Sequence, residues 1–102
     1  MADFYRATTP THKFKLNISL DTVEELKICY SQKGYKVLKK TLADCKTENG
    51  NTVVVTLTQE ETKKFYGSMA DVQIKVKTGG GNVLASPIYK ILCKDVLDDE
   101  VM

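Results

Sequence analysis

TVVVTLTQEETKKFYGSMADVQIKVKT, residues 52–78, is the stretch of sequence that predicts how this chain folds. It begins with a β-branched run in which Val53, Val55 and Leu57 share one face, as in a half-buried strand. It ends with the run VQIKV at 72–76, in which apolar and polar residues alternate. Two such strands joined by a short helical turn predict a chain that passes from one sheet of a sandwich to the other.

The connection between these two strands carries a helix-capping motif. The Thr58 hydroxyl can accept a hydrogen bond from the backbone N–H of Glu61, and the Glu61 carboxylate can accept one from the N–H of Thr58. We therefore expect one short helical turn near residues 58–66, with an aromatic residue, Phe65 or Tyr66, folded beneath it. The motif has a structural purpose and brings no chemistry of its own.

Short strands and turn signals recur along the rest of the chain. Residues 13–18, 25–31 and 35–41 are predicted strands, Asn49-Gly50 is a strong hairpin signal, and Pro87 interrupts the last strand region. Six or seven short strands, with turns about 8–12 residues apart, are typical of an all-β sandwich. The sequence therefore predicts a two-sheet antiparallel sandwich.

Period-2 alternation in four separate runs also predicts which side chains fill the core. The expected core residues are Phe14, Leu16, Ile18, Leu26, Ile28, Val53, Val55, Leu57, Val72, Ile74 and Val76. The facing of residues 35–41 and 83–94 stays open. Lysines at 36, 39 and 40 favour an edge strand, because charge discourages edge-to-edge pairing. Beside Tyr35 these lysines also suit a nucleic-acid contact, which is the less common explanation.

The totals are those of one small domain. The chain has 102 residues, of which 42% are hydrophobic and 27% charged, enough for one two-layer core but not for two. We assign residues 1–102 to a single β-sandwich domain, with an irregular lead-in at 1–12 and an acidic C-terminal tail at 95–102. The net charge of +2 is too small to predict nucleic acid as a partner. No apolar run is long enough for a membrane span, so we expect a protein made in the cytoplasm.

No constellation of residues predicts catalysis, a cofactor or a metal site. His12 is the only histidine, and we expect it to be exposed beside Pro10. Cys29, Cys45 and Cys93 are odd in number and far apart in sequence, which favours three reduced thiols over a disulfide or a zinc site. We therefore expect a protein that is not an enzyme.

The sequence resembles a family of small prophage-encoded proteins of Gram-positive bacteria along nearly its whole length. The similar segments are YRATTPTH at 5–12, ICYSQKG at 28–34, LTQEET at 57–62 followed by Phe65, LAS at 84–86, DVLD at 95–98 and EV at 100–101. The family usually has Gly at the position of Ala7. The resemblance implies an immunoglobulin-like antiparallel β-sandwich of about seven strands, related to the N-terminal domain of phage baseplate upper protein.

The same resemblance implies a virion structural protein of the tail or baseplate. Its partners would be other phage structural proteins or a second copy of the chain, and its final location would be the virion. The alternative is a ligand-binding module, such as a domain that binds host-surface carbohydrate. Carbohydrate sites favour exposed aromatic side chains, and the absence of Trp, with only five Tyr, counts against this alternative.

The two termini contain the candidate contact residues. Phe4 and Tyr5 are aromatic although their segment is too short to form a strand pair of its own, and Val96, Leu97 and Val101 flank a run of acids. Apolar residues of this kind usually pack somewhere, and an exposed sheet edge can accept an added segment through main-chain hydrogen bonds. We therefore predict that the termini dock on neighbouring chains. The alternative is that they fold back on their own domain.

Overall fold

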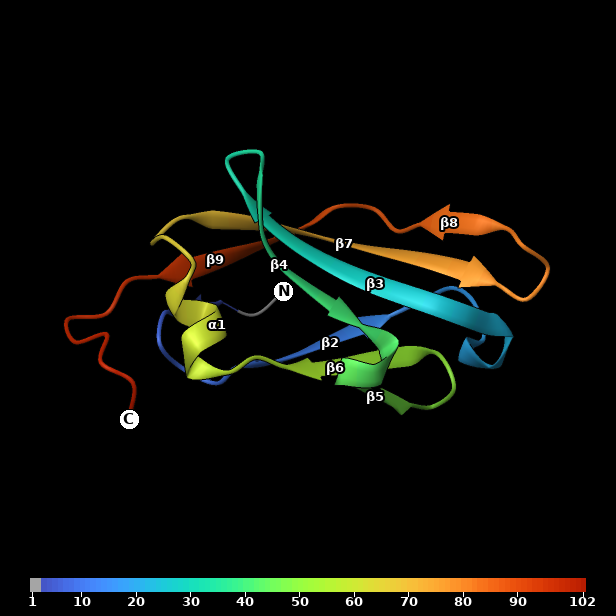
Figure 1. Cartoon of the computed structure of the whole chain (residues 1–102), viewed down its shortest axis with the longest axis horizontal. Coiled ribbons are helices and arrows are strands. Elements are labelled where there is room, and N and C mark those ends of the chain that lie inside the picture. The colour runs from blue at the N-terminus through green and yellow to red at the C-terminus, as the bar shows by residue number, and fades with distance from the viewer. Residues whose placement is uncertain (1–2) are drawn as a thin grey trace.

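The computed structural model describes residues 3–102 as two β-sheets that pack face to face (Figure 1). The larger sheet has the strand order β1-β9-β7-β3-β4, with β8 also paired to β7, and the smaller sheet has the order β2-β6-β5. The strands are β1 (Phe4–Tyr5), β2 (Thr11–Lys15), β3 (Val23–Gln32), β4 (Tyr35–Thr41), β5 (Cys45–Glu48), β6 (Thr52–Thr56), β7 (Met69–Thr78), β8 (Val83–Ala85) and β9 (Tyr89–Lys94). The helices are α1 (Gln59–Lys63) and the two short 3-10 turns η1 (Leu20–Thr22) and η2 (Leu42–Asp44).

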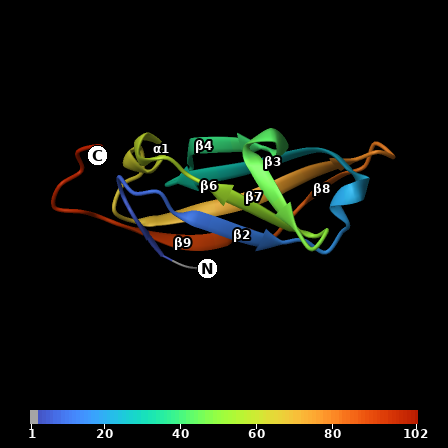
Figure 2. The same ribbon diagram turned by 90° about the horizontal axis from the view of Figure 1, so that it is seen from below.

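The strand order is that of an immunoglobulin-like β-sandwich. In this fold strands B, E and D lie in one sheet, and strands G, F and C, extended by C′ in variable-type domains, form the other. Here β2-β6-β5 correspond to B-E-D, and β9-β7-β3-β4 correspond to G-F-C-C′. Figure 2 shows β2 and β6 lying across β7 and β9. The predicted fold class is therefore confirmed.

Two details of the prediction were wrong. The sandwich is not wholly antiparallel, because β1 pairs with β9 in parallel, with Phe4 opposite Cys93. The lead-in predicted as irregular at 1–12 contains β1, and β2 begins at Thr11, although residues 1–2 of this prediction lie outside the described residues. A two-residue strand is too short to show a period-2 pattern, so β1 can be recognised only from its pairing with β9.

The core lies between the two sheets and contains almost all the predicted residues. Every predicted core residue is buried except Ile18, which is half-buried because it lies beyond the paired part of β2. Nine further buried side chains are absent from the predicted core, although Phe65 was one of the two aromatic residues expected beneath the helical turn; they are Phe4, His12, Tyr30, Gln32, Thr62, Phe65, Ala70, Ile91 and Cys93. Most of these lie at the end of the sandwich where α1 connects the two sheets.

Helix α1 carries the chain from β6 in the smaller sheet to β7 in the larger one, as predicted. The Glu61 N–H donates to the Thr58 hydroxyl at 3.2 Å, and the Thr58 N–H donates to Glu61 Oε1 at 2.9 Å, so the capping box is confirmed. Phe65 is buried beneath the turn, whereas Tyr66 is exposed. Glu61 also forms an ion pair with Lys40 of β4, with 2.6 Å between Lys40 Nζ and Glu61 Oε2. The helix is therefore fixed to both its own start and the neighbouring sheet.

The turns position the edges of the sheets. Asn49 and Gly50 both have a positive φ, at 54° and 73°, and form the predicted hairpin between β5 and β6. The lysine-rich β4 lies at one edge of the larger sheet, as expected from its charge. The interruption at Ser86-Pro87 divides the last strand region into β8 and β9, which both pair with β7. Among residues 3–102 there is no helix of the length and apolarity that a membrane span requires.

Candidate functional site

The N-terminal candidate residues divide between the core and the surface. Phe4 is only 3% exposed, and its ring packs edge-on against His12 and Phe65, at centroid distances of 5.3 Å in each case. Tyr5 is 51% exposed, and the Lys94 ammonium lies 5.5 Å from its ring centroid. Phe4 is therefore a core residue that no partner can reach in this conformation, which corrects its prediction as a contact. Tyr5 remains available.

His12 lies inside the core, contrary to the expectation that it is exposed. Its Nδ1 lies 2.7 Å from the hydroxyl oxygen of Tyr30, and its Nε2 has no hydrogen-bond partner within residues 3–102. Burial lowers the pKa of His12 and raises the pKa of Tyr30. The expectation rested on the position of His12 beside Pro10 in a segment predicted to be irregular, whereas β2 begins at Thr11 and the alternation of Phe14 and Leu16 extends inward to His12. A neutral imidazole closed to solvent has a packing role and no access to a substrate.

Arg6 fastens the C-terminal tail to the α1 end of the sandwich. Its Nε donates to the Phe65 carbonyl at 2.6 Å, and its Nη2 donates to the Lys63 carbonyl at 3.1 Å. Its Nη1 donates to Asp95 Oδ1 at 3.0 Å, and this hydrogen bond lowers the pKa of the Asp95 carboxyl. Asp99 lies 3.6 Å from the same guanidinium. One side chain thus joins the lead-in, the end of the helix and the tail.

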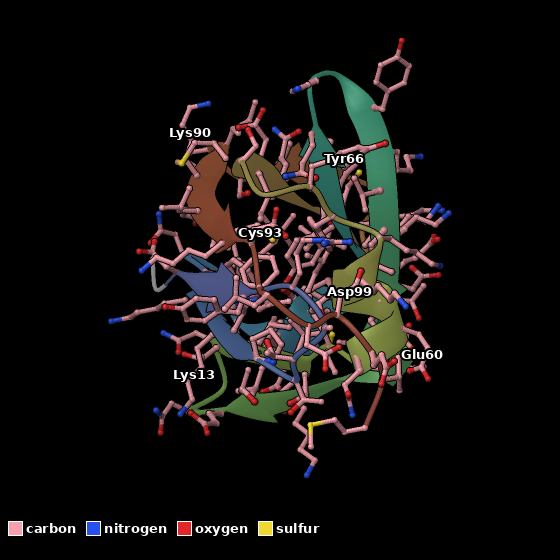
Figure 3. All side chains as sticks on the ribbon, turned by 90° about the vertical axis from the view of Figure 1, so that its left-hand side faces the viewer. Lys13, Glu60, Tyr66, Lys90, Cys93 and Asp99 are labelled. Carbon is pink, nitrogen blue, oxygen red and sulfur yellow. The ribbon has the colours of Figure 1, made fainter. Side chains whose placement is uncertain are left out.

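The last residue of the tail is held as well. The Gln59 side-chain amide donates to the Met102 carbonyl at 3.0 Å, and the Met102 N–H donates to Gln59 Oε1 at 2.7 Å. Figure 3 views this end of the molecule, where the tail that carries Asp99 passes in front of the helix that carries Glu60. Residues 95–102 form no helix or strand.

Two of the three C-terminal candidate residues point away from the domain. Leu97 is fully exposed and Val101 is 44% exposed, while Val96 is half-buried. The tail therefore has polar attachments to its own domain and apolar side chains directed to solvent. Contact of these residues with a partner stays a prediction.

A second apolar surface includes Leu84 of β8, which Figure 1 shows at the end of the sandwich opposite α1. It is a half-open groove of about 290 Å³ between the end of β2, the inner face of β7 and the residues that connect β8 to β9. The larger aliphatic residues of its lining are Leu16, Ile18, Ile74, Val76, Leu84 and Pro87. Among the described residues that line it, Lys15 is the only charged one. Sequence reasoning missed this groove.

The groove opens beside an unpaired edge of β2. The ladder between β2 and β6 is continued by a hydrogen bond at each end: the Leu16 N–H donates to the Asn51 carbonyl at 2.8 Å, and the Leu57 N–H donates to the Pro10 carbonyl at 3.0 Å. The backbone N–H and C=O groups of successive residues point to alternate sides of an antiparallel strand. The N–H and C=O groups of the odd-numbered residues from 11 to 17 therefore point away from β6. In the immunoglobulin fold strand A lies on that side. No described strand lies there, since β1 pairs with β9 in the other sheet.

Hydrogen bonds hold the wall of the groove in place. The Ser86 N–H donates to the Ile74 carbonyl at 2.8 Å, and the Ile74 N–H donates to the Ser86 hydroxyl at 3.0 Å. The Gln73 side chain donates to the Ser86 carbonyl at 2.9 Å. Tyr89, the aromatic residue of the lining, packs against Phe14 at a centroid distance of 5.6 Å. The groove is therefore better suited to an extended apolar segment than to a sugar, which requires an open aromatic platform.

The three cysteines are separate, and two of them lie where burial acts on the thiol. All three are free, and burial raises the pKa of Cys93 to about 11 and raises that of Cys45 as well. A thiol with a raised pKa is protonated at neutral pH and is therefore a weak nucleophile. Within residues 3–102 no group of three His, Cys, Asp or Glu side chains is placed to hold a metal ion.

Comparison with known proteins supports the fold. No protein-family model and no curated protein matches the sequence. The chain is similar in structure to CopC from Methylosinus trichosporium OB3b, with a TM-score of 0.59 and 13% identity over 96% of this chain and 89% of that one. The identity is too low to carry more than the fold.

Two further solved structures have lower scores. The V domain of amphioxus IgVJ-C2 has a TM-score of 0.37 and 11% identity, over 92% of this chain and 99% of that one. A putative glycoside hydrolase from Bacteroides vulgatus ATCC 8482 has a TM-score of 0.46 and 11% identity, over 91% of this chain and 16% of that one. Neither similarity bears on what this chain does.

Proposed function

We propose that this chain is a non-enzymatic structural or docking module of a phage or prophage particle, associated with its tail or baseplate. It acts through protein–protein contacts. The observation that carries this proposal is the apolar groove that opens along the unpaired edge of β2. The sequence resemblance to prophage-encoded proteins supplies the biological setting.

The two sheet edges support a docking role because they differ in chemistry. An open strand edge attracts other chains, and natural proteins usually protect it with charge. Along β4 the lysines at 36, 39 and 40 provide that protection, and Lys40 is also paired with Glu61. Along β2 the free backbone groups lie beside apolar side chains such as Leu16 and Leu84. An added strand would gain affinity from main-chain hydrogen bonds and specificity from the side chains that enter the groove.

Incorporation into particles tests the proposal. We expect an epitope-tagged chain, expressed in the lysogen that carries its gene, to co-purify with tails or baseplates after prophage induction. Leu84 is 46% exposed, so Leu84→Glu should leave the fold intact while placing a charge in the groove. Ile88 is 58% exposed and lies outside the lining, which makes Ile88→Glu the matched control.

The outcomes separate clearly if both variants melt at the wild-type temperature. Wild-type chain and Ile88→Glu should enter the particle, and Leu84→Glu should be lost from it. The proposal is contradicted if the folded wild-type chain never co-purifies with tail components. It is also contradicted if Leu84→Glu is incorporated as efficiently as the control, because the groove would then have no docking role.

A further inference from the structure

We infer that the segment docking in the groove is the C-terminal tail, residues 96–102, of a second copy of this chain. Copies would then associate head to tail, with the tail of each placed along β2 of the next. This inference rests on the proposed docking function and names the partner that the groove accepts.

The apolar side chains of the tail match the lining of the groove. Leu97 and Val101 are exposed, although the polar contacts of Arg6 and Gln59 hold the tail on its own domain. In an extended strand, residues four apart lie on the same face, so Leu97 and Val101 can enter the groove together. Asp99 lies on that face between them, and a groove that is open to solvent along one side can accommodate it.

Charge complementarity also favours the tail. Residues 95–102 contain four acidic residues and no basic one, whereas residues 11–18 of the β2 region contain two lysines and no acid. With Leu97 inward, Asp98 and Glu100 lie on the outer face of the added strand. Lys13 and Lys15 are exposed on the outer face of β2. Lys13 is paired with Glu48 at 3.3 Å, so Lys15, which has no ion-pair partner among the described residues, is the lysine that would meet an acid across the pair.

The positions of the tail and the groove determine the kind of assembly. The tail lies at the α1 end and the groove at the β8 end of a molecule 47 Å long (Figure 1). A contact between them leaves one free tail and one free groove on the pair. Such a heterologous contact extends into a filament or closes into a ring, unlike the symmetric contact of a two-fold dimer. Release of residues 96–102 breaks the Arg6–Asp99 ion pair and the two Gln59–Met102 hydrogen bonds, and the contacts in the groove replace them.

Two one-sided variants test the inference directly. Leu84→Glu blocks the groove and leaves the tail intact, whereas Leu97→Glu blocks the tail and leaves the groove intact. We expect each variant alone to sediment as a monomer at concentrations where wild-type chain and Ile88→Glu associate. An equimolar mixture of the two variants should give a dimer and nothing larger, because only one intact groove and one intact tail can meet.

A charge exchange gives a second test that leaves the apolar lining unchanged. Lys15→Glu should weaken association at low ionic strength, and adding Asp98→Lys and Glu100→Lys in the same chain should restore it. Restoration follows only if these residues face each other across the contact. If the triple variant associates no better than Lys15→Glu, the placement of the tail on β2 is wrong.

Other outcomes distinguish this inference from the proposed function. If wild-type chain stays monomeric at millimolar concentration and does not bind a synthetic peptide of residues 95–102, the tail is not the occupant. The inference is also overturned if the variant mixture remains monomeric or if either variant associates like the wild type. The docking function survives these results when Leu84→Glu still loses incorporation into particles, since the groove then binds a different protein.

Discussion

The two ends of this sandwich are completed differently. At the α1 end the rings of Phe4, His12, Tyr30 and Phe65 form edge and tilted contacts at centroid distances of 5.3–5.8 Å. Arg6 satisfies helix-end carbonyls at the same end. Strand β1 also lies at this end, since Phe4 pairs with Cys93 and packs on Phe65. At the β8 end, β2 keeps an open edge beside an apolar groove. Pairing of β1 with β9 thus brings Phe4 into the closed end, whereas no described strand covers the open edge of β2.

Truncation of a ring at the closed end should have the largest effect on stability. Phe65 is 1% exposed, and Phe65→Ala removes a ring that packs on both Phe4 and Tyr30. We expect the free energy of unfolding in urea to fall by about 3–5 kcal/mol. The matched change at the open end, Leu84→Ala, should alter it by less than about 0.5 kcal/mol, as at other exposed sites. Equal losses would show that the two ends are packed alike.

Acid should weaken the closed end through His12. Its pKa is lowered in the folded protein by burial, so below the unfolded value of 6.5 the unfolded chain binds a proton that the folded chain does not. The contribution of His12 is therefore complete above pH 6.5 and is lost as the pH falls toward the folded pKa. The free energy of unfolding should decrease there by at most about 1.4 kcal/mol per pH unit.

A double variant isolates the histidine from other titrating groups. His12→Phe combined with Tyr30→Phe removes the titration and leaves no hydroxyl without its partner. Urea titrations of this variant between pH 5 and 6.5 should give a flat profile. A slope equal to that of the wild type would assign the acid sensitivity to another group.

Loss of the capping box should have a smaller effect. Thr58→Ala removes the oxygen that accepts the Glu61 N–H, which should cost about 0.5–2 kcal/mol of unfolding free energy. Thr9→Ala is a suitable control, because Thr9 is exposed and lies outside any helix or strand. Association through the groove should be unchanged in both folded variants. A folded Thr58→Ala variant that no longer associates would make α1 part of the binding site.

The labelling rate of Cys93 measures how often the closed end opens, and this measurement needs no substitution that would change stability. Cys93 is 1% exposed and its pKa is raised to about 11 by burial, whereas Cys29 and Cys45 are half-buried. In native, non-reduced protein a thiol reagent should label Cys29 and Cys45 first and Cys93 only on unfolding. All three should react in denaturant. Labelling of Cys93 as fast as Cys29 would show that β9 opens readily at this end.

The sequence contains the local features of this structure. Alternation in the predicted strands placed ten of eleven core residues correctly, because the side-chain period of a strand needs no knowledge of its partners. The same holds for the Asn49-Gly50 hairpin and for the cap formed by Thr58 and Glu61. Each of these features depends on residues within a few positions of one another.

The features that sequence reasoning missed depend on distant partners. The pairing of β1 with β9 places Phe4 opposite Cys93, 89 positions along the chain, and leaves no periodic pattern in the sequence. His12 is buried because Tyr30 provides a hydrogen bond from another sheet. The groove is formed by residues of both sheets, and it lies beside an edge of β2 that no described strand covers. Residue types alone therefore could not identify the candidate docking site.

Residue-resolved amide hydrogen exchange tests the central claim, that the open edge of β2 is where another chain binds. Exchange measured by NMR at low and high protein concentration should show the amides of Lys13, Lys15 and Asn17 becoming protected on association. The amide of Leu16 is already hydrogen-bonded to Asn51 and should change little. Lys36 on the β4 edge should not change. Association that leaves the three odd-numbered amides in fast exchange, or that protects β4 instead, would contradict the account.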